Sequence, residues 1–218
     1  MKDWFYFLVY FIGCQPMWLT SSPVLLHRER ARRKGAYLLV CTHSSPFDVP
    51  CLIYHTPRVL DFVSIVEVFR HPLARWFFTM LKVMPLDRGR RDPATVLRVV
   101  ERLKAGRAVA MFPEGSIRTP EMSALNGGPI KPGAARIAKM AETPILPCVL
   151  VGSRQYHRFA NWLPIKRIRY GLIYGEPFTI KSDAEAAPAV FEQKLRGIFQ
   201  QLHAELAQAM DQSPRSRT

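Results

Sequence analysis

Short apolar runs and amphipathic segments alternate along most of this chain. The apolar runs are compact and rich in β-branched residues, which is typical of buried strands, and they cover 36–41, 59–66, 84–87, 108–112, 145–151 and 167–177. Segments with helical spacing of apolar positions cover 46–55, 67–83, 92–106, 133–142 and 185–210. Strands that alternate with helices predict an α/β fold: a single domain with a largely parallel central sheet flanked by helices.

The N-terminal pattern is different. "WFYFLVYFIGC" at 4–14 is an unbroken apolar and aromatic run, which Gln15 and Pro16 interrupt. A helix that spans a bilayer needs about 20 apolar residues, so this run is too short. Trp and Tyr favour the membrane interface, and we therefore expect residues 1–26 to be a membrane-interacting segment lying in one leaflet. The alternative is a helix packed on the core of the protein itself.

Charge and length refine this division. The 218 residues carry a net charge of +14 with a pI near 10.1, and "HRERARRK" at 27–34 concentrates part of it. We expect a basic linker at 27–35, the α/β domain at 36–210 and a flexible tail at 211–218. The charge favours an anionic partner, namely a membrane surface, a phosphorylated substrate or nucleic acid. The basic block is equally consistent with a solvated linker and with a contact to lipid phosphates.

The cysteines indicate a cellular compartment. Cys14, Cys41, Cys51 and Cys148 lie in apolar surroundings and form no C-x-x-C pair. This usage predicts reduced thiols, no disulfide framework and no metal site. Together with the apolar N-terminus, it places the protein at the cytoplasmic face of a membrane.

Candidate chemistry begins directly after the first apolar run of the domain, in "CTHSSPFDVP". His43 precedes a predicted helix, and Asp48 lies in the first turn of that helix. A carboxylate that binds one imidazole nitrogen fixes the tautomer and leaves the other nitrogen as a base. Read alone, the pair is better explained by Asp48 capping its helix with His43 as a loop residue, because the spacing is common.

Two later loops add anion-binding residue types at the same predicted sheet edge. "PLDRGRR" supplies Arg88, and "MFPEGSIRTP" supplies Glu114, Gly115, Ser116 and Arg118. Arginine grips phosphate with a forked guanidinium, while glycine lets backbone N–H groups approach a ligand. These loops favour a clamp for a phosphorylated acceptor beside His43.

The ordered motifs "HSSPFD", "PLDR", "FPEGS" and "ILPCVLVG" resemble the four blocks of the glycerolipid acyltransferase family. The resemblance extends from about Tyr37 to about Pro177 and includes "IKPGAARIA" at 130–138. It implies transfer of a fatty acyl group from a thioester donor to the hydroxyl of lysophosphatidate, giving phosphatidate. His43 would be the general base and Asp48 its orienting partner.

The resemblance also implies the remaining partners. Arg88, Glu114, Gly115, Ser116 and Arg118 would hold the lysolipid acceptor. Acyl-CoA or acyl-carrier protein would be the co-substrate, with no cofactor. The same reaction on another lysolipid stays open, because the stretch 64–68 carries no lysine where relatives often do. A nucleic-acid-binding protein is the remote alternative, since no zinc-finger spacing or aromatic-basic motif accompanies the charge, and we expect no nucleic-acid partner.

Overall fold

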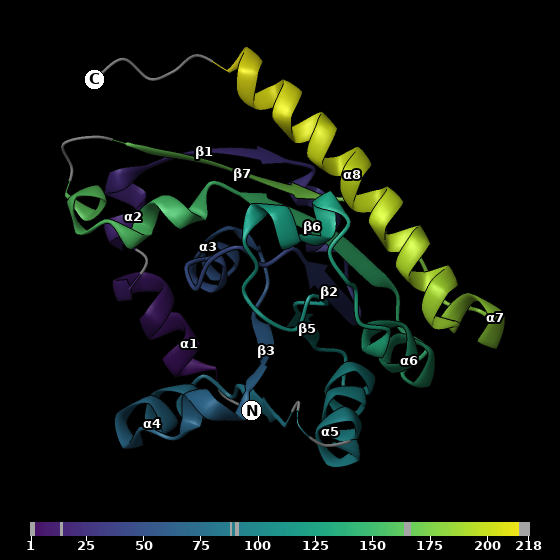
Figure 1. Ribbon diagram of the computed structural model, residues 1–218. Coiled ribbons are helices and arrows are strands. Elements are labelled where there is room, and N and C mark those ends of the chain that lie inside the picture. Colours follow the sequence, from purple (N-terminus) through teal and green to yellow (C-terminus); the bar gives the residue numbers. More distant parts are fainter. Residues whose placement is uncertain (1–2, 14, 88, 90–91, 164–166, 214–218) are drawn as a thin grey trace.

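The computed structural model describes residues 3–13, 15–87, 89, 92–163 and 167–213 (Figure 1). Seven strands form one sheet in the order β1-β7-β6-β2-β5-β3-β4. Their bounds are β1 Ser21–Leu26, β2 Tyr37–Cys41, β3 Leu60–Ile65, β4 Met84–Leu86, β5 Ala108–Met111, β6 Ile145–Val151 and β7 Ile168–Tyr174. Neighbouring strands are parallel except for β6 and β7, which run antiparallel. The predicted α/β fold with a largely parallel sheet is confirmed.

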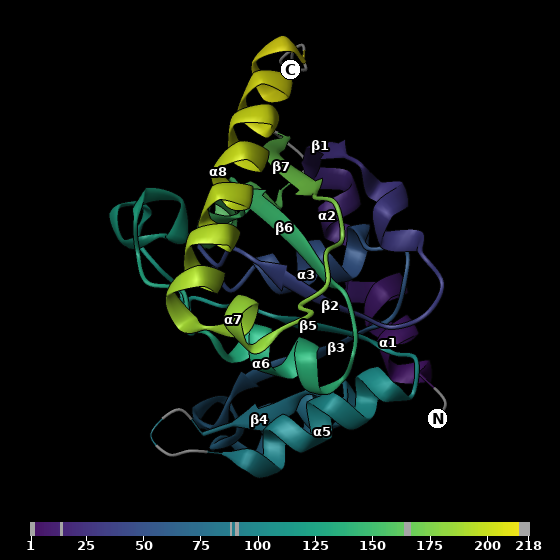
Figure 2. The same ribbon diagram turned by 90° about the vertical axis from the view of Figure 1, so that its right-hand side faces the viewer.

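Helices cover both faces of the sheet (Figures 1 and 2). One face carries α1 Trp4–Leu8, α2 Gln15–Thr20, α3 Asp48–His55 and α4 Pro72–Met80. The other carries α5 Pro93–Lys104, α6 Gly133–Met140, the short α7 Asp183–Ala186 and the long α8 Pro188–Gln212. A π-helical turn, η1, spans Val9–Gly13, and short 3-10 turns are η2 Arg28–Arg32, η3 Val66–Phe69, η4 Pro120–Met122, η5 Ala124–Asn126, η6 Ser153–His157 and η7 Phe159–Trp162.

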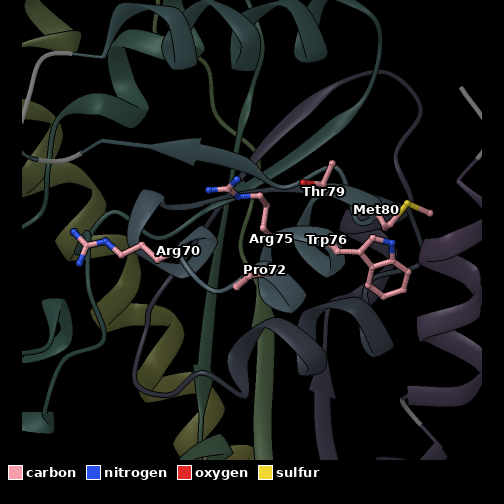
Figure 3. Close-up of a pocket in the computed structure, with 6 residues that line it drawn as sticks. All are labelled: Arg70, Pro72, Arg75, Trp76, Thr79 and Met80. Carbon is pink, nitrogen blue, oxygen red and sulfur yellow. The ribbon is translucent and has the colours of Figure 1, made fainter.

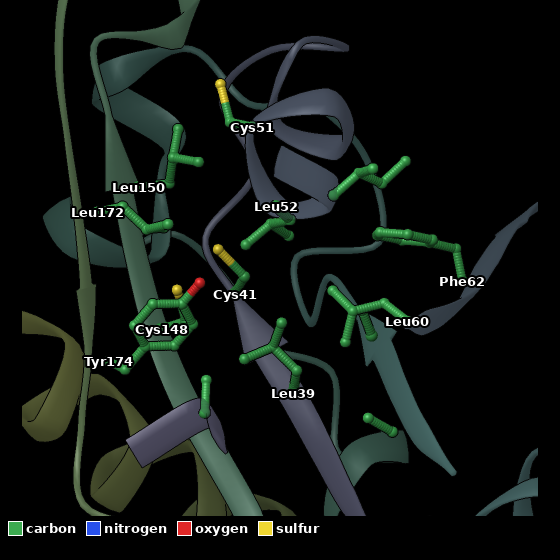
Figure 4. Packing of buried hydrophobic residues seen from close by; sticks show 14 of the residues in the cluster. Leu39, Cys41, Cys51, Leu52, Leu60, Phe62, Cys148, Leu150, Leu172 and Tyr174 are labelled. Atoms are coloured by element: carbon green, nitrogen blue, oxygen red, sulfur yellow. The ribbon is translucent and has the colours of Figure 1, made fainter. Parts of the chain in front are cut away.

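The central strand β2 is buried along its whole length. Its side chains alternate between two apolar clusters, one on each face of the sheet. Leu39 and Cys41 point into the cluster shown in Figure 4, where Cys148 of β6 is the lateral neighbour of Cys41. Burial raises the pKa of the Cys41 thiol well above its ordinary value, so this side chain packs as a small apolar group. Cys14 lies outside the described residues.

The N-terminal division differs from the expectation. Ser21–Leu26, expected in the membrane-interacting segment, forms edge strand β1 and pairs in parallel with β7. Further upstream, Phe5, Tyr6 and Met17 are buried in the core cluster. The folded domain therefore starts well before residue 36, because these apolar side chains cover one face of the sheet. Among the described residues, no helix combines the length and apolar character needed to cross a bilayer.

The basic segment 27–35 is also more structured than a linker. Its η2 turn buries Ala31 completely. The Arg28 Nε donates to the carbonyl oxygen of His55 at 2.6 Å. Arg30 donates to the carbonyl of Tyr174 at 2.8 Å and pairs with Glu176 at 2.7 Å. Two arginines expected to face solvent or lipid phosphates instead fasten this segment to the domain.

Two predicted helices are interrupted by proline. The segment 67–83 divides into η3 and α4, and the second begins at Pro72. The segment 185–210 divides into α7 and α8, and the latter begins at Pro188. Proline lacks an N–H and its ring collides with the preceding turn, so it starts a helix and does not continue one. α8 ends at Gln212, inside the stretch 211–218 that was expected to be a tail; residues 214–218 lie outside the description.

Candidate active site

The loops after β2 and β5 meet at the carboxyl edge of the sheet. The two strands are parallel neighbours, so their ends lie side by side. The backbone N–H of His43 donates to Glu114 Oε1 at 3.4 Å, and the N–H of Arg118 donates to the carbonyl oxygen of His43 at 3.0 Å. The "HSSPFD" and "FPEGS" motifs, separated by about seventy residues of sequence, therefore form one surface.

His43 and Asp48 are in direct contact. Their Nδ1 and Oδ2 atoms lie 2.9 Å apart, and the Asp48 side chain is fully buried at the first position of α3. Asp48 Oδ2 also accepts from the backbone N–H groups of Ser44 at 2.8 Å and Ser45 at 3.0 Å. Since Nδ1 faces the carboxylate, Nε2 is the nitrogen left for chemistry, and the His43 side chain keeps 13% of its surface exposed.

Two further residues hold this pair, and the sequence reasoning missed both. The buried Ser153, just after β6, donates from its hydroxyl to Asp48 Oδ1. The ring of Phe112 stacks on the His43 imidazole with centroids 3.9 Å apart and planes 14° from parallel. Phe112 is the first residue of the "FPEGS" motif, although no role was predicted for it, and nothing in the sequence pattern connects Ser153 with a residue 105 positions earlier.

Glu114 is buried below the loop that carries it. Only 1% of the residue is exposed, and Oε1 accepts long hydrogen bonds from the N–H groups of His43 and Ala124, both at 3.4 Å. Oε2 has no hydrogen-bond partner within the described part of the chain. Burial raises the pKa of Glu114, although these backbone hydrogen bonds act in the opposite direction.

Gly115 creates room for a lysine. Its φ of +71° is the left-handed conformation that favours glycine. A Cβ here would lie 2.8 Å from Lys131 Cε and 3.0 Å from Lys131 Nζ, so the lysine crosses directly over the glycine. The predicted site omitted Lys131, although the "KPG" motif that contains it was part of the resemblance. Its ammonium adds a positive charge to the loop.

The remaining predicted residues have different positions. Arg118 donates through Nη2 to the carbonyl oxygen of Glu114 at 3.3 Å, while its buried Nε has no partner among the described residues. Ser116 lines the cavity beside His43. Arg88 lies outside the described residues, and its predicted role stays a prediction.

An apolar cavity of about 590 Å³ opens beside the His43 imidazole. Its walls come from α3, β3, α4 and the N-terminal η1, and its polar lining residues are His43, Ser64 and Ser116. The apolar lining includes Val9, Val49, Ile53, Phe62, Phe77, Phe78, Leu81 and Val83. The site thus combines an oriented base, a basic loop and a slot suited to a hydrocarbon chain. The described residues contain no cluster of three or more His, Cys, Asp or Glu side chains that would hold a metal ion.

This fold and site define the class of the protein, and sequence comparison gives its family. The family profile described as Acyltransferase matches residues 24–151, more than half of the chain. The chain therefore belongs to this family and is an acyltransferase, as the ordered motifs predicted.

Individual relatives carry a more specific name. A 1-acyl-sn-glycerol-3-phosphate acyltransferase of Bacillus subtilis is 25% identical over 160 residues, which cover 73% of this chain and 75% of the relative. The enzyme of that name from Streptococcus pneumoniae is 28% identical over 178 residues, covering 79% of this chain and 62% of the relative. The crystal structure of the 1-acyl-sn-glycerophosphate acyltransferase PlsC from Thermotoga maritima shares the fold, with a TM-score of 0.65 and 20% identity over 94% of this chain and 78% of that one.

Proposed function

We propose that this acyltransferase transfers a fatty acyl group from a thioester donor to the free hydroxyl of lysophosphatidate, which gives phosphatidate for phospholipid synthesis. The observation that carries the proposal is the position of the His43–Asp48 pair between an apolar cavity and a basic loop. The names of the relatives support lysophosphatidate as the acceptor.

In this mechanism His43 Nε2 removes the proton from the acceptor hydroxyl as its oxygen attacks the thioester carbonyl carbon. The tetrahedral intermediate collapses, the carbon–sulfur bond breaks, and the leaving thiolate takes the proton back from the imidazolium. Asp48 fixes the tautomer and stabilises the transient positive charge. The thioester is already activated, so proximity and a positioned base suffice, and the mechanism requires neither a cofactor nor an acyl-enzyme.

The acyl donor and the acceptor occupy different parts of the proposed site. The acyl chain of the donor, acyl-CoA or acyl-carrier protein, occupies the apolar cavity beside His43. The acceptor lies over the "FPEGS" loop, where Gly115, Ser116 and Arg118 face the catalytic histidine and Lys131 crosses the glycine. Glu114 fixes the loop by holding the His43 backbone, and Arg88 completes the phosphate clamp.

We further propose that the protein works at an anionic membrane surface on its cytoplasmic face, where its lysolipid acceptor and its product reside. The N-terminal helices bury one side against the sheet and expose the other. The exposed apolar side chains are Trp4, Phe7, Leu8, Phe11, Ile12, Trp18 and Leu19. Such a surface fits insertion into one leaflet.

Activity assays test the acyl transfer. Wild-type protein is incubated with a labelled acyl-CoA and a panel of lysophosphatidate, lysophosphatidylcholine and lysophosphatidylglycerol. We expect transfer to lysophosphatidate, and we expect His43→Ala to lower turnover by roughly 10²- to 10⁴-fold with an unchanged circular dichroism spectrum. His203→Ala, at an exposed position of α8, is the matched control. Full activity of His43→Ala would refute the base assignment, and transfer only to another lysolipid would replace the acceptor.

A further inference from the structure

We propose that α4 forms a second membrane contact, in which Arg70 and Arg75 bind the phosphates of phospholipid headgroups while Leu73 and Trp76 enter the bilayer interface. The acyl-transfer chemistry does not require this membrane contact. The contact also lies outside the N-terminal segment. It concerns the outer surface of a helix whose inner surface borders the active-site cavity.

The two surfaces of α4 differ in character. On the inner side, Phe77 and Phe78 line the apolar cavity that contains His43. On the outer side, Leu73 is 67% exposed and Trp76 is 55% exposed. Figure 1 shows α4 at the periphery of the molecule, beside α1. A large apolar surface of this kind, edged by charge, marks an interaction site.

The charges beside these side chains suit a phosphate. A shallow pocket of about 410 Å³ is lined by Arg70, Arg75 and Trp76, and Figure 3 shows the Arg70 side chain extended away from Arg75 and from the indole ring. Arg75 Nε donates to the Phe69 carbonyl oxygen at 3.1 Å, which holds the guanidinium in place and leaves its other N–H groups available. In the part of the chain that the structure describes, neither arginine pairs with a carboxylate. Each guanidinium group can therefore bind the oxygens of a headgroup phosphate.

The α4 surface continues the exposed surface of the N-terminal helices. The Phe5 ring packs 5.5 Å from Trp76 and 5.7 Å from Phe77, which joins α1 to α4. Trp4, 57% exposed, lies 5.5 Å from the same Phe5 ring. A bilayer that meets the N-terminal segment therefore also meets α4. Since Val9 of η1 and Phe77 of α4 both line the cavity, this orientation brings the cavity walls to the lipid.

The chemistry of the patch favours a phospholipid surface over other occupants. A nucleic acid would pair with the arginines but would leave Leu73 and Trp76 in water. A second copy of the chain would bring together two like-charged patches in a protein of net charge +14. A bilayer interface accepts tryptophan and leucine while presenting phosphates at the same depth as the arginines.

Vesicle sedimentation without donor or acceptor substrate tests the proposal. The vesicles contain either phosphatidylcholine alone or phosphatidylcholine with phosphatidylglycerol. We expect the double variant R70Q/R75Q to lower partitioning onto the mixed vesicles by roughly 30-fold. We expect Leu73→Ser to lower it by roughly tenfold on both vesicle types, because an inserted leucine is lost.

The matched controls lie on the helices of the opposite face. R98Q/R136Q removes two exposed arginines from α5 and α6, and Leu97→Ser removes a 52% exposed leucine from α5. We expect both to bind like wild type. Equal losses in the two arginine pairs would show a bulk-charge effect and overturn the proposal. Wild-type binding by R70Q/R75Q would also overturn it, as would a lipid-free dimer in sedimentation velocity that Leu73→Ser dissociates.

Turnover on a short-chain, fully dissolved lysophosphatidate separates this proposal from the proposed reaction. We expect R70Q/R75Q to retain wild-type turnover there. A large loss would show that the arginines bind the acceptor and would overturn the membrane contact. If wild type itself fails to transfer acyl groups, the acyl-transfer proposal fails, while the vesicle measurements still decide the role of α4.

Discussion

The buried Ser153 hydroxyl donates a hydrogen bond to Oδ1 of Asp48, and this contact joins the end of β6 to the start of α3. Oδ2 of the same carboxylate is occupied by His43 and by the N–H groups of Ser44 and Ser45. With both oxygens engaged, the carboxylate has a fixed orientation, and the imidazole that it holds is fixed in turn. We therefore expect Ser153 to be a positioning residue that acts on the proposed reaction through Asp48.

Ser153→Ala should lower kcat by about tenfold and leave KM unchanged, because a hydrogen bond to a charged group is lost without loss of a substrate contact. Steady-state kinetics with a saturating thioester donor measure this. Thr143→Ala is the matched control: it removes another buried hydroxyl, which donates to the Ala141 carbonyl at 2.9 Å away from the site. An equal fall in kcat in both variants would show a general effect of stability and contradict the positioning role.

Much of the fold could be predicted because apolar periodicity and the strand-end rule are local signals. Each buried strand of the domain core coincides with an apolar run, and His43 and Glu114 follow two such runs directly. The parallel sheet then places both residues at one edge. The order of strands and motifs therefore predicted that these two loops adjoin, as the structure shows.

The parts of the fold and of the site that were not predicted depend on contacts between segments distant in sequence. β1 was missed because its apolar run is short, from Val24 to Leu26, and because it contains Pro23, which weakens a strand signal. Its parallel pairing with β7, far along the chain, has no local signature. Ser153 and Lys131 reach the site only through the tertiary fold, so residue type alone did not distinguish them from ordinary loop residues.

The raised pKa of Glu114 makes stability depend on pH in a definite direction. Its ordinary value is 4.5, and burial raises it in the folded protein. The folded state thus binds the proton more tightly than the unfolded chain does. The stabilisation that protonated Glu114 gives the folded state is therefore fully present below pH 4.5, and it is lost as pH rises through the folded-state pKa.

Glu114→Gln removes this titration while keeping an acceptor oxygen for the His43 and Ala124 N–H groups. Relative to the variant, wild type should lose unfolding free energy as pH rises above 4.5, the ordinary pKa of the side chain. Urea denaturation of both proteins across this range measures the difference. A difference that stays constant with pH, or changes in favour of wild type, would contradict the expectation.

The apolar cavity should set the length of the accepted acyl chain. Ile53 lies one helical turn beyond Val49 on α3, both line the cavity, and Ile53 is 3% exposed. Ile53→Phe places a ring in the slot. We expect kcat/KM for long-chain acyl-CoA to fall by at least about tenfold, while a short-chain donor serves as the internal control and keeps its value. Equal losses for both donors would show that the ring disturbs His43 and does not shorten the slot.

The N-terminal segment has two separable roles, which point substitutions distinguish and a deletion would merge. Asp3 accepts from Lys82 Nζ at 2.6 Å and from Arg107 at 3.2 Å, so it ties α1 to the domain. Asp3→Asn should lower the thermal midpoint by about 2–4 °C, a loss of about 1 kcal/mol in a chain of this size, with vesicle binding retained.

The double variant F11S/I12S changes two side chains that are 61% and 66% exposed, and it should lower vesicle partitioning by at least about tenfold at an unchanged midpoint. Differential scanning calorimetry and vesicle sedimentation on both proteins check the pair of outcomes. If F11S/I12S partitions like wild type, the N-terminal surface does not contact the membrane and its helices have a purely structural role.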